Sequence, residues 1–351
     1  MKSIMKRITN ISKIAAGFIC TLASLVLIGL FVGPKVSFAD NGSWTRKADM
    51  PTARAFLATG VVNGKIYAIG GERVLWDPNP LATMEIYDPA TDTWTKGTDM
   101  PTPRVDLVVA LVDDKLYAIG GRRGQIFLAT VEVYEPKTNR WTKKTDMPTP
   151  RWASAAGVVD GKIYVIGGLA NGQFLATVEM YDPATDTWTR KRSLPAPQLV
   201  LGTAVVDGRI YAIGGGNGTQ RVEVYDPASD AWSPKANLPT GRTGLSASVV
   251  NGKIYAIGGG RSFGELGLST VEVYDPATDA WTQATDMPTP RRVFSTAVVD
   301  GQIYAIGGTL MSPAALIPLN TVEAYTPEGG TLAVSAKGKL ATMWGVIKAA
   351  R

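Results

Sequence analysis

An arginine recurs behind a short proline segment throughout this chain. The hexapeptide DMPTPR stands at 99–104, 146–151 and 286–291, and DMPTAR stands at 49–54. A guanidinium offers a planar fork of donors that matches a carboxylate, so several such groups around one opening would form an anion site. The candidate binding arginines at this repeated position are Arg54, Arg104, Arg151, Arg242 and Arg291.

A second interpretation pairs these arginines with glutamates inside the protein. One glutamate recurs in each copy of a later apolar segment, and a buried carboxylate needs a cation or several donors. Structural ion-pair networks of this kind imitate binding sites, which favours internal pairing, although the sequence leaves both interpretations open. Gln198 takes the place of the arginine in one copy. The recurring glutamates are Glu85, Glu132, Glu179, Glu223, Glu272 and Glu323.

Two residue types that carry much protein chemistry are almost missing. The chain has no histidine, and its one cysteine, Cys20, lies in an apolar stretch near the N-terminus. This composition excludes Ser-His-Asp and Cys-His nucleophiles and imidazole-based zinc or copper sites. We therefore expect no metal and no cofactor. Enzymatic activity stays open, but the sequence favours a protein without it.

Residues 1–39 have the pattern of an export signal. A basic start leads into an apolar stretch from Ile14 to Val32, followed by small residues at Ser37 and Ala39. This order is typical of a secretory signal peptide, with cleavage expected after Ala39. The stretch is also long enough to span a bilayer, so an uncleaved anchor is the alternative. Either outcome predicts a secreted, periplasmic or membrane-anchored protein with its folded part outside the cytoplasm.

The net charge does not indicate a nucleic-acid partner. The formal charge is +6, but residues 1–39 carry five basic residues and no acid, which leaves about +1 for the rest. The remainder has no long basic run. We expect a monomer that contacts a membrane only through the N-terminal segment, if that segment is retained.

A pair of glycines ends an apolar run six times, as in KIYAIGG at 65–71 and QIYAIGG at 302–308. Five of these runs follow a two-residue Asn-Gly or Asp-Gly turn, the strongest short signal for a β-hairpin. Asp113-Asp114 replaces that turn in the second copy, where we expect a strained or altered turn. The glycines proposed to be structural are Gly70, Gly71, Gly120, Gly121, Gly167, Gly168, Gly214, Gly215, Gly258, Gly259, Gly307 and Gly308.

The diglycine, a following Tyr and then a Trp resemble the kelch repeat, and this resemblance covers residues 44–327. Four strands per copy and six copies predict an all-β fold, a six-bladed kelch β-propeller. The last copy has no Trp after Tyr325, whereas an additional Trp44 precedes the first diglycine. We therefore predict that the strand around Trp44 joins the last blade and closes the ring. The tryptophans proposed to be structural are Trp44, Trp94, Trp141, Trp188, Trp232 and Trp281.

The predicted organisation has three parts: a signal peptide at 1–39, the propeller at 40–327 and a tail at 328–351. In the tail, Leu340, Met343, Trp344 and Ile347 have helical spacing, which predicts a short docked helix or, alternatively, a sorting tail.

The segments after each diglycine differ between copies and are the better candidates for specificity, because a rigid scaffold presents binding residues on its loops. Trp152 and Arg292 also break the repeat consensus beside the recurring arginine. The further binding candidates are Trp76, Arg122, Arg123, Trp152, Arg261 and Arg292.

Three functions compete at this stage. The first is an exported binding or scaffold protein that recognises a glycan, peptide or protein through one face of the propeller. The second is a cofactor-free carbohydrate isomerase that resembles bacterial sialic-acid mutarotases at the level of the fold, with Glu72, Asp77 and Asp106 as available acids and bases. The third is an intracellular adaptor, which the export pattern argues against. Galactose-oxidase-like copper chemistry is excluded, because histidine and a mature cysteine are missing.

Overall fold

The structure is a computed structural model that describes residues 41–74, 77–311 and 316–328. The expected signal peptide, Trp76 and the tail beyond Glu328 lie outside the described residues. All described residues belong to the unit Phe38–Arg351. Within them, no helix is long and apolar enough to cross a membrane.

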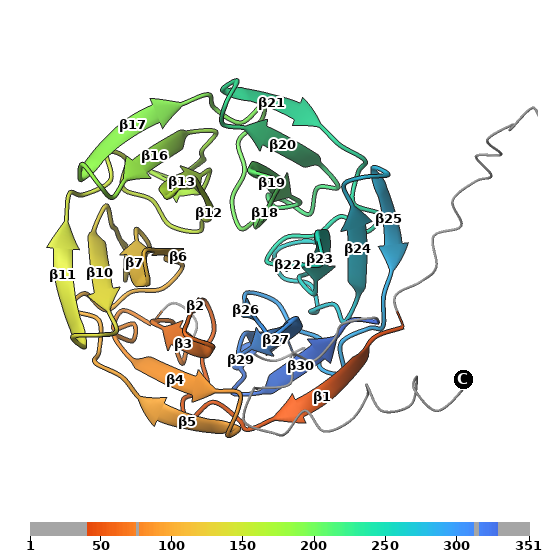
Figure 1. Cartoon of the computed structure of the whole chain (residues 1–351), viewed down its shortest axis with the longest axis horizontal. Coiled ribbons are helices and arrows are strands. Elements are labelled where there is room, and N and C mark those ends of the chain that lie inside the picture. Colours follow the sequence, from red (N-terminus) through yellow and green to blue (C-terminus); the bar gives the residue numbers. More distant parts are fainter. Residues whose placement is uncertain (1–40, 75–76, 312–315, 329–351) are drawn as a thin grey trace, which may run out of the picture. The chain divides into compact units, whose positions relative to one another are not determined.

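Six antiparallel four-stranded sheets form the blades of a β-propeller (Figure 1). The strands of blades one to three, from the axis outward, are β2 (Ala58–Val62), β3 (Lys65–Ile69), β4 (Met84–Asp88), β5 (Thr93–Lys96); β6 (Val108–Val112), β7 (Lys115–Ile119), β10 (Val131–Glu135), β11 (Arg140–Lys144); β12 (Ala155–Val159), β13 (Lys162–Ile166), β16 (Val178–Asp182), β17 (Thr187–Lys191).

The strands of blades four to six, in the same order, are β18 (Gly202–Val206), β19 (Arg209–Ile213), β20 (Val222–Asp226), β21 (Ala231–Pro234); β22 (Ser246–Val250), β23 (Lys253–Ile257), β24 (Val271–Asp275), β25 (Ala280–Gln283); β26 (Ser295–Val299), β27 (Gln302–Ile306), β30 (Val322–Thr326), β1 (Ser43–Lys47). The predicted all-β six-bladed propeller is thus confirmed.

The N-terminal strand closes the ring, as the sequence predicts. Strand β1 pairs with β30, and Trp44 lies opposite Tyr325 in the register. Figure 1 shows β1, in orange, as the outermost strand beside the blue β30. The Trp44 indole donates to the carbonyl of Thr285 in the preceding blade at 3.0 Å.

The segments that follow the second strand of each blade all emerge at the same end of the blades. We call this surface the loop face, and it comprises residues 72–83, 122–130, 169–177, 216–221, 260–270 and 309–321, where described. Three of its segments form small hairpins. They are β8 (Arg122–Arg123) with β9 (Ile126–Phe127), β14 (Leu169–Ala170) with β15 (Gln173–Phe174), and β28 (Thr309–Met311) with β29 (Leu316–Pro318).

The turns between the first two strands lie at the opposite end. Asn63 and Gly64 have φ angles of 51° and 72°, as a type I′ turn requires. Asp113 and Asp114 adopt the same left-handed region at 49° and 59°, so the second blade keeps this turn type. The turn type is therefore not altered. The strain expected there lies at Asp114, a non-glycine residue with a positive φ at the second turn position.

The hydrophobic core lies between neighbouring blades. Tyr87 of blade one, for example, lies 5.9 Å from Tyr304 of blade six, ring centre to ring centre. Each of the six core clusters combines residues from two adjacent blades. A single blade would leave both apolar faces in water, so the ring folds as one cooperative unit.

The diglycine brings two blades into close backbone contact. Gly70 has a φ of 68°, and a Cβ there would lie 2.6 Å from the carbonyl oxygen of Arg104 of the next blade. Gly70 donates to the carbonyl of Thr83, and Gly71 donates to that of Arg104. This position therefore needs glycine both for its conformation and for its lack of a side chain.

Candidate functional site

The recurring arginines are buried and pair with the recurring glutamates. All five have a relative exposure of 0%. The Nη2 atoms of Arg54 and Arg104 lie 3.0 Å from the carboxylates of Glu85 and Glu132, and that of Arg291 lies 2.6 Å from Glu323. Arg151 and Arg242 form the same pairs with Glu179 and Glu272.

Each pair is completed by hydrogen bonds within the same blade. Arg151 donates to the carbonyls of Gly167 and Thr177, and Thr149 donates to the second oxygen of Glu179. Burial lowers the pKa of Arg54 and of Arg104 to about 10, so both guanidinium groups stay charged at neutral pH. The five arginines therefore have no surface for an external anion in this structure, and the internal pairing interpretation describes their geometry.

Blade four lacks this arrangement. Gln198 stands in the arginine position and Ala196 in the threonine position, so Glu223 has neither partner. Arg221, which is 46% exposed, lies 3.6 Å from Glu223 instead. Burial raises the pKa of Glu223, and Arg221 offsets that only in part.

A closed ring of six backbone hydrogen bonds surrounds the propeller axis. One residue from each blade donates its N–H to the carbonyl of the preceding blade, at 2.8–3.2 Å between nitrogen and oxygen. All six have a φ between 47° and 64°, and five of them are not glycine, so the ring holds strained backbone. We call these residues the mouth ring: Phe56, Asp106, Ala153, Val200, Gly244 and Val293.

The next residue of each blade forms a second ring, made of Leu57, Leu107, Ser154, Leu201, Leu245 and Phe294. The two rings enclose a cavity of about 100 Å³, and the second ring also lines an axial channel of about 270 Å³. Asp106 is the one charged residue and Ser154 the one hydroxyl residue in the two rings. The polar positions therefore lie in two adjacent blades, two and three.

A buried cluster of two acids and one arginine lies beside the mouth ring. Arg122 donates to both carboxylate oxygens of Glu72, at 3.2 and 3.3 Å. The Arg122 Nε atom forms an ion pair with Oδ2 of Asp106 at 3.5 Å, a longer contact than those with Glu72. Only 1–2% of the Glu72 and Arg122 side chains and 6% of the Asp106 side chain are exposed.

Desolvation raises the pKa of Asp106 to about 7. The nearby Arg122 favours the ionised carboxylate, but the negative charge of Glu72 opposes it. Near neutral pH the cluster therefore exchanges one proton, and its buried net charge changes between 0 and −1.

Two aromatic rings cover this cluster. The Arg122 guanidinium carbon lies 5.2 Å from the centre of the Trp152 ring, and Phe127 stacks on Trp152 at 6.3 Å between ring centres. Arg122 and Trp152 were both proposed from the sequence as binding residues, and the structure brings them together.

The other described binding candidates are Arg123, Arg261 and Arg292. Arg292 is buried and donates to the carbonyls of Ser262 and Glu265, so it supports the 260–270 loop of the preceding blade. Arg123 and Arg261 are exposed. Trp76 lies outside the described residues.

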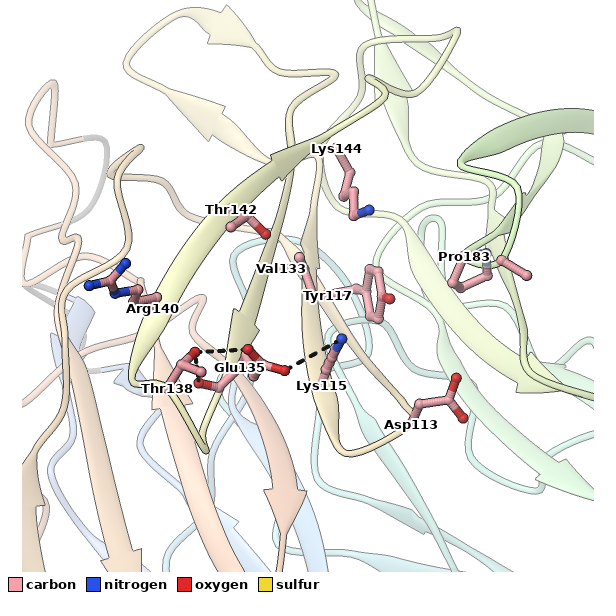
Figure 2. A pocket seen from close by; sticks show the side chains of 11 residues that line it. Asp113, Lys115, Tyr117, Val133, Glu135, Thr138, Arg140, Thr142, Lys144 and Pro183 are labelled. Atoms are coloured by element: carbon pink, nitrogen blue, oxygen red, sulfur yellow. Dashed lines mark hydrogen bonds and ion pairs between the residues drawn. The ribbon is translucent and has the colours of Figure 1, made fainter.

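An open groove of about 600 Å³ lies between blades two and three, away from the loop face (Figure 2). Lys115 approaches Glu135 at 3.5 Å within it, and Arg140 and Lys144 are further lining residues. The equivalent positions of blade four line a smaller groove of about 270 Å³ around Arg209 and Tyr211. Because the groove recurs with the repeat, it follows from blade geometry, and we assign it no function.

Ser154 was missed as a site residue from the sequence, and Asp106 and Glu72 were considered only as acids for an isomerase. Aligning the six repeats with one another could have indicated these three residues. Each of them is polar at a position where most other repeats have an apolar or small residue. The sequence does not say which exceptions meet, since contacts between blades are made at long range.

Comparison with known families places most of the chain in one repeat class. The model described as the KLHDC2/KLHL20/DRC7 Kelch-repeats domain matches residues 99–238 and 144–308. The model described as the Kelch motif matches residues 53–101 and 290–331. Together these matches extend from residue 53 to residue 331.

Two curated relatives and one solved structure are similar to parts of the chain. Two F-box/kelch-repeat proteins of Arabidopsis thaliana are 43% and 45% identical over 51 residues, which is 14% of this chain but only 11% and 13% of theirs. The chain thus matches a small part of those relatives. The structure titled "Structure of YjhT" has a TM-score of 0.67 and 17% identity, and covers 80% of this chain and 97% of that one. At this identity the likeness concerns the fold.

We expect the Arg151→Ala variant to unfold at a melting temperature on the order of 10 °C below wild type, because it leaves Glu179 buried without its cation. Thermal unfolding followed by circular dichroism measures this. The control is Arg190→Ala, which removes an exposed arginine from the outer strand of the same blade. An unchanged melting temperature together with loss of binding to an acidic ligand would restore the anion-site interpretation.

We expect the stability of the wild type to decrease by roughly 2–3 kcal/mol between about pH 5 and pH 8.5, and Asp106→Asn to remove this decrease. The folded protein holds a proton on Asp106 up to a pKa of about 7, whereas the unfolded chain releases it near the ordinary aspartate pKa of 3.8, so ionisation disfavours the fold in this window. The chain has no histidine to obscure the effect. Denaturant unfolding across this pH range measures it, with Asp114→Asn on an exposed turn as the control. A pH profile identical in wild type and Asp106→Asn would contradict it.

Proposed function

This chain belongs to the kelch-repeat family, and from that premise we propose that it is an exported protein that binds a protein or peptide through the loop face of its propeller. The kelch propeller fold supports a protein-binding scaffold role in general. The basic, apolar and small-residue order of residues 1–39 supports export.

The distribution of exposed apolar side chains carries this proposal. Seven large apolar side chains are exposed among the described residues, and six of them lie on the loop face. Five of the six blades contribute at least one, whereas the short segment 216–221 of blade four contributes none. The six are Val74, Ile126, Phe174, Phe263, Leu266 and Ile317, with exposures of 38–64%.

A protein or peptide fits this surface better than a glycan. Four of the six side chains are aliphatic, and aliphatic groups bury the apolar side chains of a partner, whereas sugar rings are commonly stacked on aromatic ones. Exposed apolar groups gathered on one face of a soluble domain are typical of interaction sites. Exposed Arg123 and Arg261 lie among them and can contact acidic groups of the partner.

We expect the double variant Phe174→Ser/Phe263→Ser to lose at least about tenfold in affinity for the partner, because central apolar contacts carry most of the binding energy of an interface. Peptide and glycan arrays identify the ligand class, and calorimetry with the best ligand measures the loss. Both side chains are exposed, so the melting temperature stays near that of the wild type.

Leu111→Thr is the matched control, because Leu111 is the seventh exposed apolar residue and lies on an inner strand away from the loop face. Binding that is lost in this control but kept in the double variant would contradict the loop face as the binding surface. Binding to glycans without any peptide ligand would contradict the proposed partner class.

A second candidate function is a cofactor-free carbohydrate isomerase, and the cluster of Asp106, Glu72 and Arg122 favours it. An acid with a pKa of about 7 beside a second carboxylate can donate and accept protons at neutral pH. We expect such an enzyme to accelerate the exchange of sialic-acid anomers, followed by NMR, and Asp106→Asn to abolish the acceleration. Exchange at the uncatalysed rate would remove this candidate.

A further inference from the structure

We propose that the mouth of the axial channel binds the alkylammonium group of a lysine side chain presented by the protein partner. This inference rests on the proposed binding of a protein through the loop face, because the mouth lies at the centre of that face. It names a contact that the partner makes there.

The charges at the mouth call for a cation. Glu72 and Asp106 carry two negative charges when ionised, and Arg122 supplies one positive charge. All three side chains are almost completely buried, so the remaining negative charge has little access to water. A proton or a bound cation is therefore needed to neutralise it.

Two buried polar atoms at the mouth have no hydrogen-bond partner. They are Oδ2 of Asp106 and Oγ of Ser154. Both residues line the same cavity of about 100 Å³, from adjacent blades. Buried polar atoms in native proteins nearly always have a hydrogen-bond partner, and Oδ2 of Asp106 has only the long ion pair with Arg122. Two acceptors without a hydrogen bond beside one cavity therefore favour a ligand with N–H donors.

The fold itself does not require these polar groups. At the position of Asp106 the other five blades have Phe56, Ala153, Val200, Gly244 and Val293, and all of them complete the hydrogen-bond ring through the backbone. At the position of Ser154 the other blades have leucine or phenylalanine. A function at the mouth explains why blades two and three differ.

The size and lining of the cavity fit an ammonium group on an alkyl chain. An ammonium is compact and presents three donors, which suit Asp106 and Ser154 together. The planar guanidinium of an arginine is wider, and a carboxylate would meet the negative charge of Glu72 and Asp106. The apolar residues of the mouth ring, Phe56, Val200 and Val293, provide apolar contact for the methylene groups.

Proton release should accompany binding at mildly acidic pH. The charged groups that face Asp106 are Arg122 and Glu72, and Trp152 beside them does not titrate. A bound ammonium replaces the proton held by Asp106, so the affinity rises as pH increases through the pKa of this carboxyl.

The first test uses n-butylammonium, which reproduces the lysine side chain, and the full purified chain. We expect calorimetry to show binding that is at least about tenfold tighter near pH 8 than near pH 5.5, with proton uptake by the buffer at the lower pH. The uncharged 1-butanol should not bind. Asp106→Asn should weaken butylammonium binding at least about tenfold near pH 8, and Ser154→Ala should weaken it several-fold.

The control variant is Asp114→Asn, which removes one carboxylate from the opposite end of the blade and should bind like the wild type. Equal affinity of wild type and Asp106→Asn, or no binding of butylammonium at tens of millimolar, would overturn the proposal. Melting temperatures of all variants are measured in parallel, so that a loss of binding is compared only between folded proteins.

A second test distinguishes a lysine side chain from a chain N-terminus. An N-acetylated, C-amidated Gly-Lys-Gly peptide should bind more tightly than the same peptide with norleucine in place of lysine. Tighter binding of unblocked Gly-Gly-Gly would overturn the assignment to lysine. If partner capture depends on Phe174 and Phe263 while Asp106→Asn leaves it unchanged, this inference fails and the proposed function stands.

Discussion

Closure of the ring is the constraint on which the rest of this structure depends. Every blade buries its two apolar faces only against its two neighbours, so an open end would expose a full face to water. The pairing of β1 with β30 joins the first residues of the propeller to its last strand. Along the axis, the mouth ring closes by backbone hydrogen bonds alone. These hydrogen bonds need only a backbone with a positive φ, so they form with different residue types. The side chains at the mouth can therefore differ from blade to blade.

The most repetitive polar residues of the chain serve the blades themselves. Each recurring arginine has its carboxylate and its carbonyl acceptors within its own blade, and none is exposed. Repetition is therefore a sign of structure here. Blade four is the exception that supports this interpretation. Gln198 replaces its buried arginine, and Glu223 lies near the partly exposed Arg221 instead.

Positions where the repeats disagree are more informative about function. Glu72, Asp106, Arg122 and Ser154 differ from the residue types at these positions in most other blades. The first three meet at the mouth, and Ser154 lines the same cavity as Asp106. A ring of near-equivalent blades presents the same residues on every side of its axis. A binding site for a single partner needs residues that differ from one side to the other. The exposed apolar residues of five loop segments surround this asymmetric centre, so that the loop face combines an apolar rim with a buried acidic mouth.

The sequence by itself determined the fold, the number of blades and the closing strand, because the diglycines, the hairpin turns and the tryptophans are local signals repeated at regular spacing. It also identified the loop segments as the variable part. The burial of the recurring arginines, the meeting of Asp106 with Arg122 and Glu72, and the cavity that Asp106 shares with Ser154 were decided only by the tertiary structure. These residues lie up to 82 positions apart, from Glu72 to Ser154, and come from three blades. Their contact depends on how the blades are rotated about the axis, and no local pattern in the chain encodes that rotation.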